Sequence, residues 1–169
     1  MEPREVVAKI PFFADVLGPA DLDAVAARAQ PRFFPPDSVL MQEEDFGASM
    51  FALIDGEVSV SVDDGRGGTD LVAKLSGGDI VGEMSLMTGA RRSATVTALT
   101  PVNALEITKV GLESILARAP RLIDRFSEML EKRQTELDSI HKDAARWTVL
   151  GLSRVEIVSL MRNFFFGAT

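Results

Sequence analysis

The spacing of apolar residues changes twice along this chain of 169 residues, from helical to strand-like and back to helical. In the first part, apolar positions three and four apart predict a short helix over residues 4–17, which Pro11 interrupts. A second helical pattern starts at Pro19 and ends at Gln30-Pro31, because a proline restricts the backbone of the residue before it. We therefore expect residues 1–32 to form an N-terminal helical segment.

From Phe33 onward, apolar and polar residues alternate in short runs, of which Val58, Val60 and Val62 are one example. Alternation with a period of two is typical of strands that bury one face. Segments such as Asp55-Gly56-Glu57 have the composition of hairpin turns between such strands. Short strands at this regular spacing predict a mainly β fold with flanking helices, with the β part over residues 33–108.

The helical pattern returns over residues 109–145, which we assign to C-terminal helices. One helix is predicted over Val110 to Arg118, and a longer one runs from Arg121 to about Lys142, beyond the break at Ala119-Pro120.

Residues 146–169 are predicted to form an apolar helical tail. Ser153-Arg154-Val155-Glu156 matches a capping box, which begins a helix, and Phe164-Phe165-Phe166 lies near its end. Such an apolar segment either packs back on the domain as a core plug or presents a patch to a partner or a second copy.

Composition narrows the classes of function. The net charge of -7 and the lack of a basic stripe argue against a nucleic-acid surface. The chain has no cysteine, and His141 is its only histidine, so we expect no disulfide framework, no metal and no cofactor. No apolar run is long enough for a membrane span, and the first residues do not resemble a signal peptide. We expect a soluble, cytoplasmic chain.

The densest candidate chemistry lies over residues 82–96. Glu83 follows a glycine at the start, and Arg92 stands nine positions later. A short helical turn over Met84 to Met87 would aim free N–H groups at an anion, and the guanidinium of an arginine matches phosphate oxygens at two points. Glu83 would repel a phosphate, so its expected role is to accept hydrogen bonds from neutral hydroxyls. The stretch therefore indicates a small anionic ligand that carries hydroxyl groups.

Gly82-Glu83-Met84-Ser85-Leu86 and Arg92-Ser93-Ala94-Thr95-Val96 stand at the spacing of a known motif. They closely resemble the phosphate-binding cassette of cyclic nucleotide-binding domains. The resemblance implies an eight-stranded, jelly-roll-like β-roll with N-terminal helices and a C-terminal lid helix. It also implies a set of ligand contacts: the cyclic phosphate on Arg92, the ribose 2′-hydroxyl on Glu83, backbone amides around Met84, Ser85, Ser93 and Ala94, and close backbone approach at Gly82.

The ligand implied by the resemblance is cAMP or cGMP. The family uses threonine directly after the phosphate arginine to hold the guanine of cGMP, and Ser93 in that place favours cAMP, with cGMP tolerated. The family also swings its terminal helix over the nucleotide as a lid, and Arg133 lies on that segment. Its guanidinium either stacks on the purine or is solvated on the helix surface, and both interpretations stay open.

Other functions fit the sequence less well. A metal enzyme of the cupin type needs clustered histidines and carboxylates, and Ser85 and Ser93 lack a nearby histidine to activate them. We therefore expect no enzyme activity. A transcription regulator of the catabolite-activator type needs a DNA-reading module after the lid helix, and the residues that remain are too few for three helices. A degenerate roll that acts only as an interaction module stays open as the alternative.

The tail, residues 146–169, together with the run from Met129 to Gln134, loosely resembles the C-terminal ends of bacterial cyclic nucleotide-regulated channels. This resemblance implies an effector or channel domain in a longer parent chain. Self-association through the C-terminal helices is a further expectation.

Overall fold

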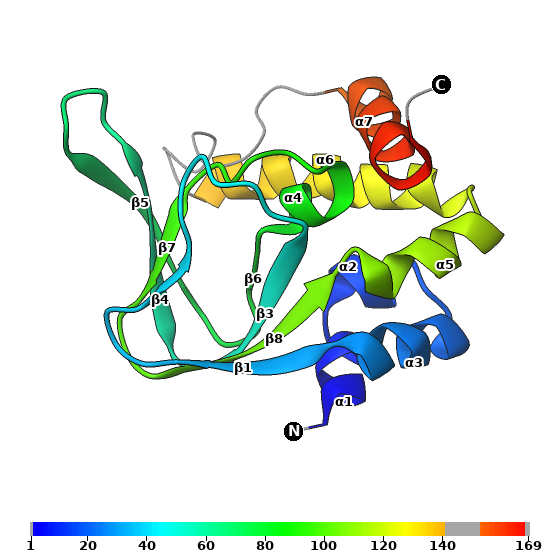
Figure 1. The fold of residues 1–169 in the computed structure, drawn as a ribbon, viewed down its shortest axis with the longest axis horizontal. Helices are drawn as coiled ribbons and strands as arrows, with labels where there is room; N and C mark the ends of the chain where they lie inside the picture. Colours follow the sequence, from blue (N-terminus) through cyan, green and yellow to red (C-terminus); the bar gives the residue numbers. More distant parts are fainter. Residues whose placement is uncertain (1, 141–152, 168–169) are drawn as a thin grey trace.

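The computed structural model describes residues 2–140 and 153–167, without the side chains of 133–140. The helices are α1 (Pro3–Ala8), α2 (Pro11–Ala14), α3 (Pro19–Arg28), α4 (Glu83–Thr88), α5 (Val110–Arg118), α6 (Leu122–Ile140) and α7 (Arg154–Phe166). The strands are β1 (Gln30–Phe34), β2 (Val39–Met41), β3 (Ser49–Asp55), β4 (Glu57–Asp63), β5 (Thr69–Ser76), β6 (Ile80–Val81), β7 (Thr95–Ala98) and β8 (Val102–Thr108). Figure 1 shows the strands on one side of the molecule and α1, α2, α3 and α5 gathered on the other.

In the described part of the chain, eight strands form two four-stranded sheets. Their orders are β1-β8-β3-β6 and β2-β7-β4-β5, and the paired strands are antiparallel. This arrangement confirms the prediction of a β-roll with flanking helices. Strand β1 begins at Gln30, although Pro31 had been expected only to end a helix. Proline is tolerated there because β1 is an edge strand.

Strand β3 separates two apolar cores. Phe51 and Leu53 face the interior of the roll, where they pack with residues of β4, β5 and β7. Met50 and Ala52 belong to the second core, which the helices fill. The strand is therefore buried on both faces, whereas the alternating pattern had predicted one buried face. The helices that cover its outer face account for the difference.

The N-terminal segment forms two short helices where the sequence had predicted one over residues 4–17. Ile10 is extended, with φ of -94° and ψ of 110°, and Pro11 begins α2. Proline fits the first turn of a helix because that turn needs no N–H donor, and it excludes helical geometry at the residue before it. The break turns Phe12 and Phe13 into the second core, where both are buried.

The C-terminal helices complete the second core. Helix α6 buries Leu122, Ile123, Phe126 and Leu130. Among the residues described, no helix combines the length and the apolar character needed to cross a membrane.

Helix α7 begins with the capping box predicted at Ser153. The side chain of Ser153 accepts a hydrogen bond from the N–H of Glu156, and the side chain of Glu156 accepts one from the N–H of Ser153. The tail packs back on the domain through Ile157 and Met161, which are fully buried, and Phe165 packs against the same core. Phe164 and Phe165 are only half-buried, and Phe166 is exposed. Helical spacing places Phe164 and Phe165 on the same face as Ile157 and Met161, about one turn further on, and turns Phe166 away from that face.

Candidate functional site

Helix α4 is a short helix enclosed between two glycines in the left-handed conformation. Gly82 precedes it with φ of 86°, and Gly89 follows it with φ of 74° and donates its N–H to the carbonyl of Ser85 at 2.9 Å. All six residues of α4 are buried. Glycine is required at both ends because other residues rarely adopt a positive φ. The chain leaves the sheet after β6, and these two glycines fix the position of the helix that follows.

The guanidinium of Arg92 points into the protein beside this helix. Only 7% of the residue is exposed. One terminal nitrogen, Nη1, donates to the carbonyl oxygen of Ser49 at 2.6 Å, and the other, Nη2, donates to Ser49 Oγ at 3.1 Å. Because arginine has five N–H donors, these two contacts orient the group without using all of them.

The loop between β2 and β3 holds Arg92 on its other side. The N–H of Glu44 donates to the carbonyl of Arg92, and the N–H of Arg92 donates to the carbonyl of Asp45, both at 2.8 Å. A Cβ atom at Gly47 would overlap the guanidinium, and one at Gly82 would lie 2.8 Å from its Nη1. Two glycines thus provide the space that the guanidinium occupies.

Burial lowers the pKa of Arg92, while the negative charges of Glu106 and Asp45 act in the opposite direction. An arginine guanidinium stays protonated in proteins even under such conditions. The site therefore contains a positive charge that is largely withdrawn from water, and a buried charge is stabilised when an ion of the opposite sign binds it.

The structure gathers most of the residues that the sequence had proposed. Glu83, Met84 and Ser85 form the buried first turn of α4, next to Gly82 and therefore next to the guanidinium of Arg92. The two residues that follow Arg92 lead into β7, with Ser93 half-buried and Ala94 buried. Arg133 lies on α6, but its side chain is outside the described residues.

Sequence reasoning missed Gly47 and Ser49. Both lie more than thirty positions before the motif, and neither forms part of a recognisable pattern. Their role depends on the pairing of β3 with β8 and β6, which brings this segment next to Arg92. A glycine two positions before a strand was the one signal available.

The neighbouring arginine, Arg91, points outward. Its guanidinium lies 4.3 Å from the centroid of the Phe46 ring, and that phenylalanine is 77% exposed. A cation over an aromatic face at an exposed site contributes about 0.5–1 kcal/mol. Arg91 is thus an exposed cation close in sequence to Arg92 and serves as a natural comparison for it.

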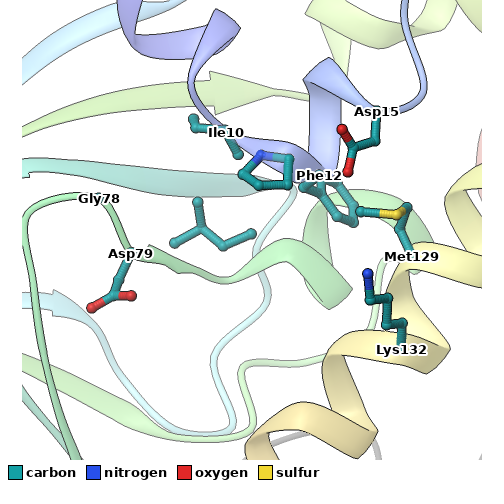
Figure 2. Close-up of a pocket in the computed structure, with 9 residues that line it drawn as sticks. Ile10, Phe12, Asp15, Gly78, Asp79, Met129 and Lys132 are labelled. Atoms are coloured by element: carbon teal, nitrogen blue, oxygen red, sulfur yellow. The ribbon is translucent and has the colours of Figure 1, made fainter.

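A cavity of about 310 Å³ lies elsewhere, between the N-terminal helices, the turn before β6 and α6. Figure 2 shows Phe12 and Met129 on its walls, with Asp15, Asp79 and Lys132 around it. Of the residues proposed for the ligand whose side chains are described, none lines this cavity. Two carboxylates would also oppose an anion there. The region around Arg92 is therefore the better candidate for binding a phosphate.

Comparison with known proteins agrees with this geometry. The family model for the cyclic nucleotide-binding domain matches residues 31–119, which include both sheets and α4. The chain belongs to the cyclic nucleotide-binding domain family.

Relatives fall into several classes of regulated protein. The chain is 31% identical over 130 residues to a cyclic nucleotide-gated potassium channel of Rhizobium etli, a match that covers 76% of this chain and 35% of that channel. It is 23% identical over 160 residues to a CRP-like cAMP-activated global transcriptional regulator of Mycobacterium tuberculosis, covering 95% of this chain and 71% of the regulator. A solved cyclic nucleotide-binding domain from Methylobacillus flagellatus is 31% identical with a TM-score of 0.65, covering 80% of this chain and 78% of that one. The chain spans about a third of the length of the channels that it matches.

Proposed function

We propose that this chain is a regulatory sensor domain that binds a cyclic nucleotide at residues 82–96, with cAMP favoured over cGMP. The observation that carries the proposal is the buried guanidinium of Arg92, held inward by Ser49 between Gly47 and Gly82. Burial of a charged side chain costs free energy. An arginine that binds no ligand would therefore be more stable at the surface, in contact with water.

In this proposal each residue has one role. Arg92 binds the cyclic phosphate through charge-assisted hydrogen bonds. Backbone amides around Met84, Ser85, Ser93 and Ala94 complete the phosphate contacts, and Gly82 lets the backbone come close. Glu83 accepts a hydrogen bond from the ribose 2′-hydroxyl. Its position supports this role, because Glu83 directly follows Gly82, which lies beside the guanidinium of Arg92.

The proposed output is a movement of α6 over the nucleotide. Contacts that form only when this helix is closed would favour the closed state, which is a shift of population. Arg133 is the candidate for contact with the purine base, since it follows the part of α6 that packs on the core through Phe126 and Leu130.

The protein that the domain controls is proposed from its relatives. A channel is favoured, because one of the relatives is a cyclic nucleotide-gated potassium channel. The lack of cysteine agrees with a reducing compartment, so the proposal includes a cytoplasmic location. Self-association through α6 and α7 is also part of the proposal, and analytical ultracentrifugation with and without cAMP tests it.

Calorimetric titration with cAMP and cGMP tests the binding proposal. We expect micromolar or tighter binding of cAMP, and a loss of at least about 2 kcal/mol in Arg92→Ala, the size of a hydrogen bond to a charged group. Arg91→Ala is the matched control, because it removes an exposed arginine that stacks on Phe46, and it should bind within about twofold of the parent.

No heat with either nucleotide would contradict the sensor proposal and favour the alternative, a degenerate roll that acts only as an interaction module. An enzyme of the metal-dependent type is a less favoured candidate. Among the described side chains, no three His, Cys, Asp or Glu residues are grouped as metal ligands. Measurement of the metal content of the purified protein tests this class directly.

A further inference from the structure

Helix α7 contacts the end of α4 that lies farther from Gly82. The ring of Phe164 lies directly over Gly89, where a Cβ atom would come within 2.5 Å of its Cδ1. Any other residue at 89 would collide with this ring and would also have to adopt a φ of 74°. Phe164 is therefore fitted to the last turn of α4.

The same phenylalanine has a second neighbour that leads back to the arginine site. The ammonium of Lys109 lies 4.3 Å from the centroid of the Phe164 ring. The N–H of Lys109 donates to the carbonyl of Ala48 at 3.0 Å, and Ala48 directly precedes Ser49, which orients Arg92. Two separate sets of contacts thus join Phe164 to the region of Arg92, one through α4 and one through Lys109.

The rest of α7 is firmly anchored in this position. Ile157 and Met161 are fully buried in the same apolar core as Met84 and Met87 of α4. On the exposed side, the guanidinium of Arg154 forms an ion pair of 2.8 Å with Glu128 of α6. Figure 1 shows α7 lying across α6, close to α4.

We propose that α7 is a regulatory helix that reads the state of α4, and that docking of α7 and binding of cyclic nucleotide favour each other. This inference rests on the proposed function. Under that function, the nucleotide contacts the first turn of α4 and Phe164 of α7 contacts Gly89, the C-cap of α4, and the whole helix has only six residues. A helix this short and this buried moves as one unit, so a restraint at either end orders the other. Docked α7 therefore preorganises the phosphate site, and preorganisation increases affinity.

The coupling between α7 docking and nucleotide binding can be measured in two ways, through nucleotide affinity and through the stability of docked α7. If docked α7 strengthens nucleotide binding by some factor, the nucleotide stabilises docked α7 by the same factor. We expect Phe164→Ala in the full chain to weaken cAMP binding about fivefold, within the usual range of such coupling. In the parent protein, saturating cAMP should slow amide hydrogen exchange in residues 153–167 by a similar factor.

Two further variants sharpen the measurement. Lys109→Gln removes the cation that stacks on Phe164 and keeps a side chain of similar length, and it should weaken cAMP binding in the same direction. Val155→Ala is the matched control, since Val155 lies on the same helix and is 79% exposed. Its affinity for cAMP should equal that of the parent, and circular dichroism confirms that each variant is folded.

The possible results separate the two proposals. Should the parent bind cAMP while Phe164→Ala and Lys109→Gln bind it equally well and exchange in α7 stays unchanged, the role of α7 is refuted and the sensor function stands. Faster exchange in α7 on addition of cAMP also refutes it, because the coupling would then have the opposite sign. A parent protein that binds no cyclic nucleotide refutes both.

Discussion

Arg92 contacts Ser49 at two points, and only one of them depends on the identity of residue 49. Nη1 donates to the main-chain oxygen at 2.6 Å, which any residue would supply, and Nη2 donates to the side-chain Oγ at 3.1 Å. The main chain of β3 therefore fixes where the guanidinium lies, and the hydroxyl adds control over its rotation. In the proposed function, this rotation decides which donors face the phosphate.

Ser49→Ala should weaken cAMP binding modestly. The variant keeps the main-chain contact and loses a hydrogen bond that acts on the nucleotide only through Arg92. We therefore expect a loss of about 1 kcal/mol, less than that of a direct hydrogen bond to a charged group, which corresponds to about fivefold in affinity. Ser61→Ala is the control, because Ser61 is a half-buried serine on β4, in the other sheet. Calorimetric titration of both variants measures the difference. Equal affinity in the two would mean that the main chain of β3 orients Arg92 unaided.

Gly47→Ala should reduce nucleotide binding more strongly than it reduces stability. A methyl group at Gly47 would occupy the volume of the guanidinium, and the flexible end of Arg92 would have to move away. We expect cAMP binding to weaken at least about tenfold, because a displaced guanidinium loses its charge-assisted contact with the phosphate. The denaturation midpoint should change little, since the strain is relieved by movement of one side chain.

Gly18→Ala is the control for that variant, because a Cβ atom at Gly18 has open space around it. It should leave cAMP affinity unchanged in the same titration. A large loss of stability in Gly47→Ala, measured by urea denaturation, would show that Arg92 cannot yield and would contradict the prediction.

The sequence predicted the part of the site that is local in the chain. Gly82, Glu83 and Arg92 lie within eleven positions of one another, and the glycine that ends α4 falls in the same stretch. Short-range geometry governs these residues, so their spacing carries the information. Gly47 and Ser49 reach the site through strand pairing, and no local pattern encodes which strand lies beside which.

Local sequence patterns also left parts of the fold unpredicted. Alternating apolar residues predicted strands, but they could not distinguish a strand with one covered face from β3, which helices cover on its second side. The two-residue strand β6 was also missed, because its length is too short for any periodicity. For the tail, the composition predicted an apolar helix, yet only the position of α4 determines that Ile157 and Met161 are its buried residues.

Glu83→Gln tests the proposed contact with the ribose. The substitution keeps the shape of the side chain and removes the charge that would strengthen a hydrogen bond from the 2′-hydroxyl. We expect cAMP binding to weaken by about 1.5 kcal/mol. The matched ligand is 2′-deoxy-cAMP, which lacks that hydroxyl and should bind the parent and the variant with nearly equal affinity. An equal loss for both ligands in calorimetry would assign Glu83 a structural role instead.

Ser93→Thr should change the preference between the two nucleotides. Family members that bind cGMP use threonine at this place to hold the guanine, and Ser93 offers the hydroxyl with more rotational freedom. The added methyl restricts that rotation, so the affinity for cGMP should rise relative to cAMP by about threefold to tenfold, as expected for one better-ordered hydrogen bond. Competition titration with both nucleotides gives the ratio directly. Ser93→Ala is the complementary variant and should lower the ratio.

Met161→Ala should destabilise the whole domain, although the residue lies on the last helix. Met161 is fully buried in a core shared with α4, α5 and α6, and truncation of such a side chain costs about 2–5 kcal/mol. Val155→Ala on the exposed side of the same helix should change the free energy of unfolding by less than about 0.5 kcal/mol. Urea denaturation followed by circular dichroism provides both values. Because α7 contacts α4 and α6 at once, its removal from the core should lower the stability of the roll and the helices in a single transition. Two separate transitions in the parent protein would mean that α7 unfolds on its own, and the cooperative unit would then end at α6.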